Sequence, residues 1–245
     1  MSSEKLRINL LPGKRKTLFV AFTGILHGIM GDRPGEFIKS TNNNGEFTSI
    51  YISDLSTSWY NDEVIHESIV RTIRDIQSKY EIEETILLGN SMGGYGALLF
   101  SSEVNASLVI SIVPQFSVDP SIIPFDKRWS VYQQKISKYR SGNLNDHISS
   151  RCRYFVLGAG EDPIDMQHIS MIKNGINITT FIVKAKHDLA AKLKNSGSLR
   201  SFFDMCRKNN PNAALMLLQT VYGHAEIMPS DTARAPASFS NSITD

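Results

Sequence analysis

The sequence TILLGNSMGGYGALLF, residues 85–100, decides the fold. It begins with a short apolar run, which is typical of a buried β-strand, and the small residues that follow are typical of a closely packed helix. Between the two stands a single serine, Ser91, with Gly89 two residues before it and Gly93 two residues after it. A serine raised on so sharp a turn crowds both positions, and glycine relieves the clash that a side chain would create. The stretch therefore predicts a strand, a tight turn that carries Ser91, and a helix.

This pattern, G-x-S-x-G between a strand and a helix, resembles the nucleophile elbow of the α/β-hydrolases. The resemblance is to small serine esterases and acyl hydrolases, and by architecture it covers residues 6–207. It implies that Ser91 is a nucleophile whose hydroxyl stands at the edge of the sheet. There the N-terminus of the following helix favours developing negative charge, an arrangement that suits acyl transfer.

Six apolar segments predict a parallel sheet with right-handed crossovers, because a helical or helix-length segment separates each from the next. They are residues 17–22, 47–53, 85–89, 107–113, 153–157 and 178–183. A weaker alternation over residues 6–10 indicates an edge strand. The order of these segments around Ser91 is similar to that of the α/β-hydrolases. The resemblance implies a three-layer α/β sandwich, with a mostly parallel central sheet, helices on both faces and a short cap-like excursion at residues 114–148. Within the excursion we expect a helix around residues 127–139.

One domain is predicted over residues 1–208, followed by a C-terminal segment over residues 209–245. In that segment Pro211 is typical of a first helical position, so we expect one further helix there. Residues 229–245 are rich in Ser, Ala, Thr and Pro and have few large apolar side chains. This composition predicts a disordered tail.

A serine hydroxyl needs a base to accept its proton, and the base needs an acid that holds its tautomer. In the α/β-hydrolases these groups follow one another as serine, acid and histidine. The resemblance assigns the acid to Asp162, with Asp165 as the alternative. The surrounding GAGEDPID is similar to the family's glycine-x-x-aspartate-proline loop, although Ala159 stands where the family usually has glycine. The histidine is assigned to His187, in KAKHDLAAKL after the last predicted strand, with His224 as the alternative.

The resemblance also implies an oxyanion hole built from backbone N–H groups. One belongs to Met92, directly after the serine, and the other to Gly24 or Ile25 in the loop after the first core strand. Further residues are candidates for a substrate pocket, although each has a plain alternative as a loop or core-packing residue. They are His27, Trp59, Tyr60 and Trp129.

Composition and spacing exclude several other classes of function. The net charge is +2, from 26 basic and 24 acidic residues, which argues against a nucleic-acid partner. No apolar run approaches the roughly 18 residues of a membrane helix, and two cysteines without a disulfide framework favour a reducing compartment, the cytoplasm. Neither H-E-x-x-H nor paired-cysteine spacing occurs, and G-x-G-x-x-G is absent, so no metal and no cofactor is predicted.

These observations predict a serine hydrolase that cleaves an ester or thioester of a small-molecule or acylated substrate through an acyl-enzyme. Ser91 attacks, His187 transfers the proton and Asp162 orients the histidine. Two alternatives stay open. The same residues could pass the acyl group to an alcohol or sugar, or the chain could be a non-catalytic binding member of the fold.

Overall fold

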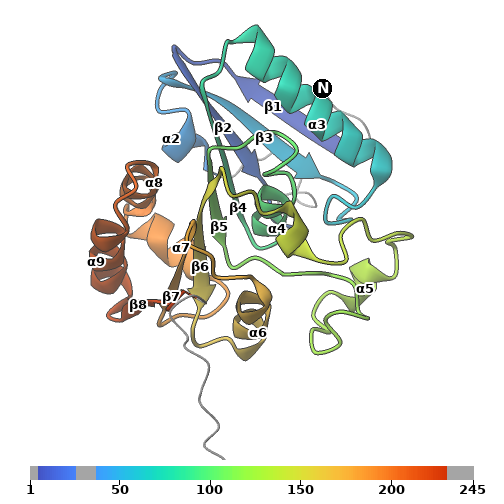
Figure 1. Cartoon of the computed structure of the whole chain (residues 1–245), viewed down its shortest axis with the longest axis vertical. Helices are drawn as coiled ribbons and strands as arrows, with labels where there is room; N and C mark the ends of the chain where they lie inside the picture. The colour runs from blue at the N-terminus through green and yellow to red at the C-terminus, as the bar shows by residue number, and fades with distance from the viewer. Residues whose placement is uncertain (1–4, 26–36, 231–245) are drawn as a thin grey trace, which may run out of the picture.

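The computed structural model describes residues 5–25 and 37–230 and consists of one sheet covered by helices (Figure 1). The sheet has eight strands in the order β1-β3-β2-β4-β5-β6-β7-β8. Neighbouring strands from β3 to β7 are parallel, and the edge strands β1 and β8 are antiparallel to their neighbours. The strands are β1 (Leu6–Leu11), β2 (Arg15–Phe22), β3 (Phe47–Asp54), β4 (Glu84–Asn90), β5 (Leu108–Ile112), β6 (Arg153–Ala159), β7 (Ile178–Val183) and β8 (Ala225–Ile227). The predicted parallel sheet is confirmed.

The central strands are apolar on both faces because helices cover both sides of the sheet. In β2, Leu18, Val20 and Phe22 belong to one hydrophobic core, and Phe19 and Ala21 belong to the other. All five side chains are buried. This explains why the segment reads as a continuous apolar run rather than as an alternating one.

The helices form the two outer layers (Figure 1). On one face lie α3 (Glu63–Lys79), α4 (Met92–Leu99) and α6 (Pro163–Met171). On the other lie α2 (Ile38–Thr41), α7 (Leu189–Asn195), α8 (Leu199–Arg207) and α9 (Pro211–Tyr222). No helix of the described part of the chain has the length and apolar character needed to cross a membrane.

The excursion between β5 and β6 contains little regular structure. Instead of the predicted helix over residues 127–139, it has a single turn, α5 (Ser130–Gln133), and later a 3-10 turn, η1 (Leu144–His147). Contacts distant in sequence lie at both ends of the predicted range: Arg128 Nη1 donates to Asp165 Oδ1 at 2.9 Å, and the backbone N–H of Arg140, directly after the range, donates to Asn61 Oδ1 at 2.8 Å. The expected helix was therefore wrong because contacts distant in sequence fix this segment.

The segment after residue 208 completes the sheet. Ala214, Leu218 and Tyr222 of α9 are buried in the second core, and β8 pairs with β7. The strand β8 has three residues, too few for a periodic pattern in the sequence. For this reason no strand was expected there. The end of the predicted tail, residues 231–245, lies outside the described residues.

Candidate active site

Ser91 lies on the turn between β4 and α4 and has an unusual backbone conformation, with φ 56° and ψ −120°. The turn is too tight for side chains at its two glycines. A Cβ atom on Gly89 would lie 2.1 Å from the carbonyl oxygen of Gly93, and one on Gly93 would lie 2.1 Å from the carbonyl oxygen of Phe22. Both glycines are therefore required, and the second brings α4 directly against the end of β2.

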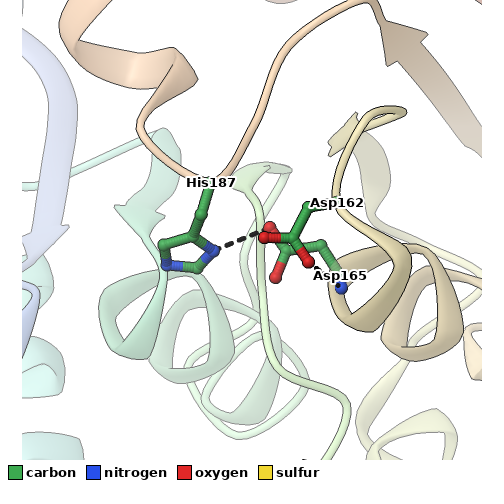
Figure 2. A group of neighbouring side chains, drawn as sticks. All are labelled: Asp162, Asp165 and His187. Carbon is green, nitrogen blue, oxygen red and sulfur yellow. Dashed lines mark hydrogen bonds and ion pairs between the residues drawn. The ribbon is translucent and has the colours of Figure 1, made fainter. Parts of the chain in front are cut away.

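Ser91 and His187 lie in hydrogen-bond contact. The Nε2 atom of His187 is 3.0 Å from Ser91 Oγ, and its Nδ1 atom is 2.7 Å from Asp165 Oδ2. A carboxylate accepts only, so Nδ1 carries the proton and Nε2 is left to accept from the serine hydroxyl. Figure 2 shows the histidine facing the start of α6, from which the two aspartates project.

The carboxylate that contacts His187 belongs to Asp165, whereas the sequence favoured Asp162. Asp162 is the N-cap of α6, and its Oδ1 accepts the backbone N–H groups of Ile164 at 3.0 Å and of Asp165 at 3.1 Å. Pro163 opens the helix and so places Asp162 at the capping position. An aspartate directly before a proline that begins a helix is typical of an N-cap. This pattern could have identified Asp162 as the cap, and therefore Asp165 as the carboxylate that contacts His187.

Asp162, Asp165 and His187 are close enough together to suggest a cation site, since one ligand atom from each lies within 4.8 Å of the others. The guanidinium of Arg128 argues against it. Its Nη1 lies 2.9 Å from Asp165 Oδ1 and 3.6 Å from Asp162 Oδ2. A positive charge therefore already lies beside both carboxylates, where a cation would have to bind.

Arg128 is held in place by a second, deeper ion pair. Its Nε donates to Asp126 Oδ1 at 3.0 Å, and its Nη2 donates to Asp126 Oδ2 at 2.9 Å. His168 Nε2 lies 3.0 Å from the same carboxylate, and the backbone N–H of Phe116 donates to His168 Nδ1 at 3.1 Å. Nδ1 is thus an acceptor, so the His168 proton lies on Nε2 and is donated to Asp126.

The side chains of Asp126 and His168 are completely buried. Burial alone would raise the pKa of Asp126, but the hydrogen bonds from His168 and Arg128 outweigh it and hold this pKa well below its usual value. No local pattern marks the pair of Asp126 and His168, because the two residues lie 42 positions apart in sequence.

Gln115 also contacts Ser91. Its Nε2 donates to Ser91 Oγ at 3.2 Å, and its Oε1 accepts from the indole N–H of Trp59 at 3.2 Å. Both side chains are fully buried. Trp59 is therefore a buried residue linked to the candidate nucleophile through Gln115, and it does not line an open surface. The ring of Trp129, the other tryptophan of the expected pocket, is centred 6.4 Å from that of His187.

The loop after β3 supports this side of the site. Trp59 and Tyr60 both have positive φ angles, 52° and 60°. The carboxylate of Asp54 accepts the backbone N–H groups of Ser58 at 2.8 Å and of Tyr60 at 3.0 Å, and so holds the loop. The Tyr60 hydroxyl donates to the backbone carbonyl of Thr23 at 3.0 Å. Tyr60 is thus a fully buried support for the loop after β2.

Gly24 and Ile25, the expected oxyanion donors, follow Thr23 in that loop, and Met92 begins α4. The close contact of Gly93 with the end of β2 brings these two segments together. His27 lies outside the described residues.

Several solved structures superpose on most of the chain. The capsule O-acetyltransferase of Neisseria meningitidis serogroup A does so with a TM-score of 0.60 at 21% identity, over 83% of this chain and 92% of that chain. FphF, a fluorophosphonate-binding serine hydrolase of Staphylococcus aureus, has a TM-score of 0.54 at 12% identity, over 80% and 91%. MenH from S. aureus has a TM-score of 0.54 at 14% identity, over 83% and 98%.

Neither protein-family models nor curated protein sequences match the chain. The likeness is one of structure, and it extends over nearly the whole length of the three proteins named above. Together with the parallel sheet and the serine turn after β4, it shows that the chain has the α/β-hydrolase fold.

Proposed function

We propose that the protein is a serine acyl hydrolase that cleaves an ester or thioester through an acyl-enzyme. The observation that carries this proposal is the alignment of Ser91 Oγ, both ring nitrogens of His187 and the carboxylate of Asp165, at 3.0 and 2.7 Å. A buried acid, a histidine and a serine in hydrogen-bond sequence are the groups that activate a hydroxyl as a nucleophile. We assign the acid to Asp165, because Asp162 caps α6.

In acylation, His187 Nε2 takes the proton of Ser91 while Oγ forms a bond to the carbonyl carbon. The carbonyl oxygen becomes an oxyanion, and the N–H of Met92 together with that of Gly24 or Ile25 is proposed to stabilise it. The intermediate then collapses and expels the alcohol or thiol, which receives the proton from His187. Asp165 keeps the imidazole oriented and stabilises its positive charge.

The second candidate is an acyltransferase, in which an alcohol or sugar instead of water attacks the acyl-enzyme. Support for it comes from the likeness to the Neisseria capsule O-acetyltransferase, over 92% of that chain. Both reactions use the same acyl-enzyme and differ only in the acceptor. The proposal places the protein in the cytoplasm, since Cys152 and Cys206 are buried free thiols.

A fluorophosphonate probe tests the nucleophile, because it phosphonylates activated serines. We expect the wild-type protein to be labelled and to release p-nitrophenol from p-nitrophenyl acetate, and Ser91→Ala to lose both reactions. Ser196→Ala, at an exposed serine after α7, is the matched control and should behave as wild type. Labelling that persists in Ser91→Ala would refute the assignment, and a wild-type protein inert in both assays would favour a binding protein. Adding small alcohols and sugars to the ester assay separates hydrolysis from transfer.

A further inference from the structure

The orientation of the Gln115 amide is fixed by its surroundings. An indole N–H can only donate, so the amide oxygen must face Trp59 Nε1, at 3.2 Å. The amide nitrogen then faces Ser91 Oγ, also at 3.2 Å. Ser91 Oγ therefore has two partners with opposite roles. It donates its proton toward His187 and accepts an N–H from Gln115.

A packing role alone does not explain an amide at this position. Gln115 has no exposed surface, and a buried amide costs stability unless it is hydrogen-bonded. Its bond to Trp59 depends on a loop in which Trp59 and Tyr60 have left-handed backbones, conformations that side chains rarely adopt. Such strain persists where the surrounding structure over-determines it, and it gathers at functional sites. Here the strained loop holds the indole N–H that orients the Gln115 amide toward Ser91 Oγ.

We propose that Gln115 is a catalytic residue that donates a hydrogen bond to Ser91 Oγ while this oxygen carries developing negative charge, and that it thereby speeds breakdown of the acyl-enzyme. The inference rests on the proposed function, because it requires an acyl group on Ser91. It holds equally for a hydrolase and for a transferase, since Ser91 Oγ is the leaving atom in both.

In breakdown, the acceptor, water or an alcohol, gives its proton to His187 Nε2 as its oxygen bonds to the acyl carbon. The bond between the acyl carbon and Ser91 Oγ then breaks, its electron pair goes to Oγ, and His187 returns the proton to Oγ. In the acyl-enzyme Oγ is an ester oxygen and a weak acceptor, but in this transition state it is partly an alkoxide. The bond from Gln115 is therefore much stronger in the transition state than before it, which is the condition for catalysis.

In acylation the gain is smaller. The free serine hydroxyl already accepts the Gln115 N–H at 3.2 Å, so part of the interaction is present before the reaction begins. Loss of the donor should thus slow breakdown more than formation, and the acyl-enzyme should accumulate.

The variant Gln115→Met tests this, because methionine has a similar shape and length but no donor. With p-nitrophenyl acetate in stopped flow, we expect the rate after the burst to fall roughly 10- to 100-fold, and the initial burst to fall less. Mass spectrometry of the quenched reaction should show acetylated protein at steady state. Gln133→Met is the matched control, because Gln133 is a buried glutamine of the same excursion that forms no hydrogen bond to Ser91 in the described structure. It should keep wild-type burst and steady-state rates.

Trp59→Phe provides an independent variant, since it keeps an aromatic ring but frees the Gln115 amide to rotate. We expect a several-fold slower breakdown, in the same direction. The proposal is overturned if Gln115→Met breaks down its acyl-enzyme within about twofold of wild type. If circular dichroism shows that Gln115→Met is unfolded, the test passes to Trp59→Phe. Breakdown within about twofold of wild type in Trp59→Phe then overturns the proposal. A wild-type protein that a fluorophosphonate does not label refutes the proposed function itself, whereas a labelled protein with unchanged Gln115→Met kinetics refutes only the role of Gln115.

Discussion

Asp162 and Asp165 lie three positions apart and both lie beside Arg128, but their main hydrogen-bond partners differ. The first accepts backbone N–H groups at the start of α6, and the second contacts His187 at 2.7 Å and Arg128 at 2.9 Å. The distinction depends on Pro163, which makes α6 begin at a fixed residue. Asp162 therefore caps α6, and the carboxylate of Asp165 contacts His187.

Exchanging each carboxylate for an amide separates the two roles. Asp165→Asn preserves the shape but cannot stabilise a positively charged imidazole, so kcat for p-nitrophenyl acetate should fall on the order of 100-fold or more. Asp162→Asn keeps an oxygen that can cap α6, and its kcat should stay within a few-fold of wild type. Steady-state kinetics of the two purified variants checks this. A larger loss in Asp162→Asn than in Asp165→Asn would return the acid role to Asp162.

Candidate site residues could be predicted from the sequence where their signals are local. Ser91 stands in a pentapeptide, and His187 follows the last parallel strand, and the structure brings the two side chains within 3.0 Å. Gln115 and Arg128 could not be assigned in this way. Their contacts depend on the folded positions of Trp59, 56 residues from Gln115, and of Asp165, 37 residues from Arg128.

At the scale of elements, ion pairs and a buried hydrogen bond join the excursion between β5 and β6 to α6. Asp126 and Arg128 come from the excursion, and His168 and Asp165 come from α6. The apolar strands could be predicted because any apolar neighbour can bury them. The structure of the excursion could not be predicted, because it depends on specific pairs of polar side chains that are distant in sequence.

Asp126→Asn tests how much this link stabilises the fold. The pKa of Asp126 is lowered in the folded state, so its stabilising charge is fully present above its ordinary value, about 4, and is lost as the pH falls toward the lower folded value. We expect the free energy of unfolding to be about 2 kcal/mol lower in the variant at pH 7 and pH 5. Below about pH 4 the difference between variant and wild type should shrink. Urea unfolding across this pH range measures it, and a difference that grows on acidification would contradict the proposed pairing.

At the scale of the whole molecule, the candidate site is made by one edge of the sheet. The carboxyl ends of all the parallel strands contribute to it: Thr23 after β2, Trp59 after β3, Ser91 after β4, Gln115 after β5, Asp165 after β6 and His187 after β7. Parallel strands place these ends side by side, so residues spread over more than 160 positions meet in a small volume. The predicted strand order therefore carried most of the information about where the site lies.

The C-terminal boundary provides a test at the same scale. A chain ending at residue 208 lacks β8 and α9, and with them the buried side chains of Ala214, Leu218 and Tyr222. It also loses the bond from the Tyr222 hydroxyl to the Leu189 carbonyl, 2.7 Å long. We expect this chain to be insoluble or to unfold at least roughly 10 °C below a chain ending at residue 230. Equal melting temperatures in differential scanning calorimetry would instead support a domain that ends at residue 208.

The contact between position 93 and the carbonyl of Phe22 sets the distance between the start of α4 and the loop after β2. That distance is a property of two backbones and does not depend on any side chain of the excursion. Substitutions at Trp129 and its neighbours should therefore leave the geometry of the proposed oxyanion donors unchanged. A substitution at Gly93 would alter that geometry whatever the substrate. A library of variants should therefore keep Gly93 unchanged.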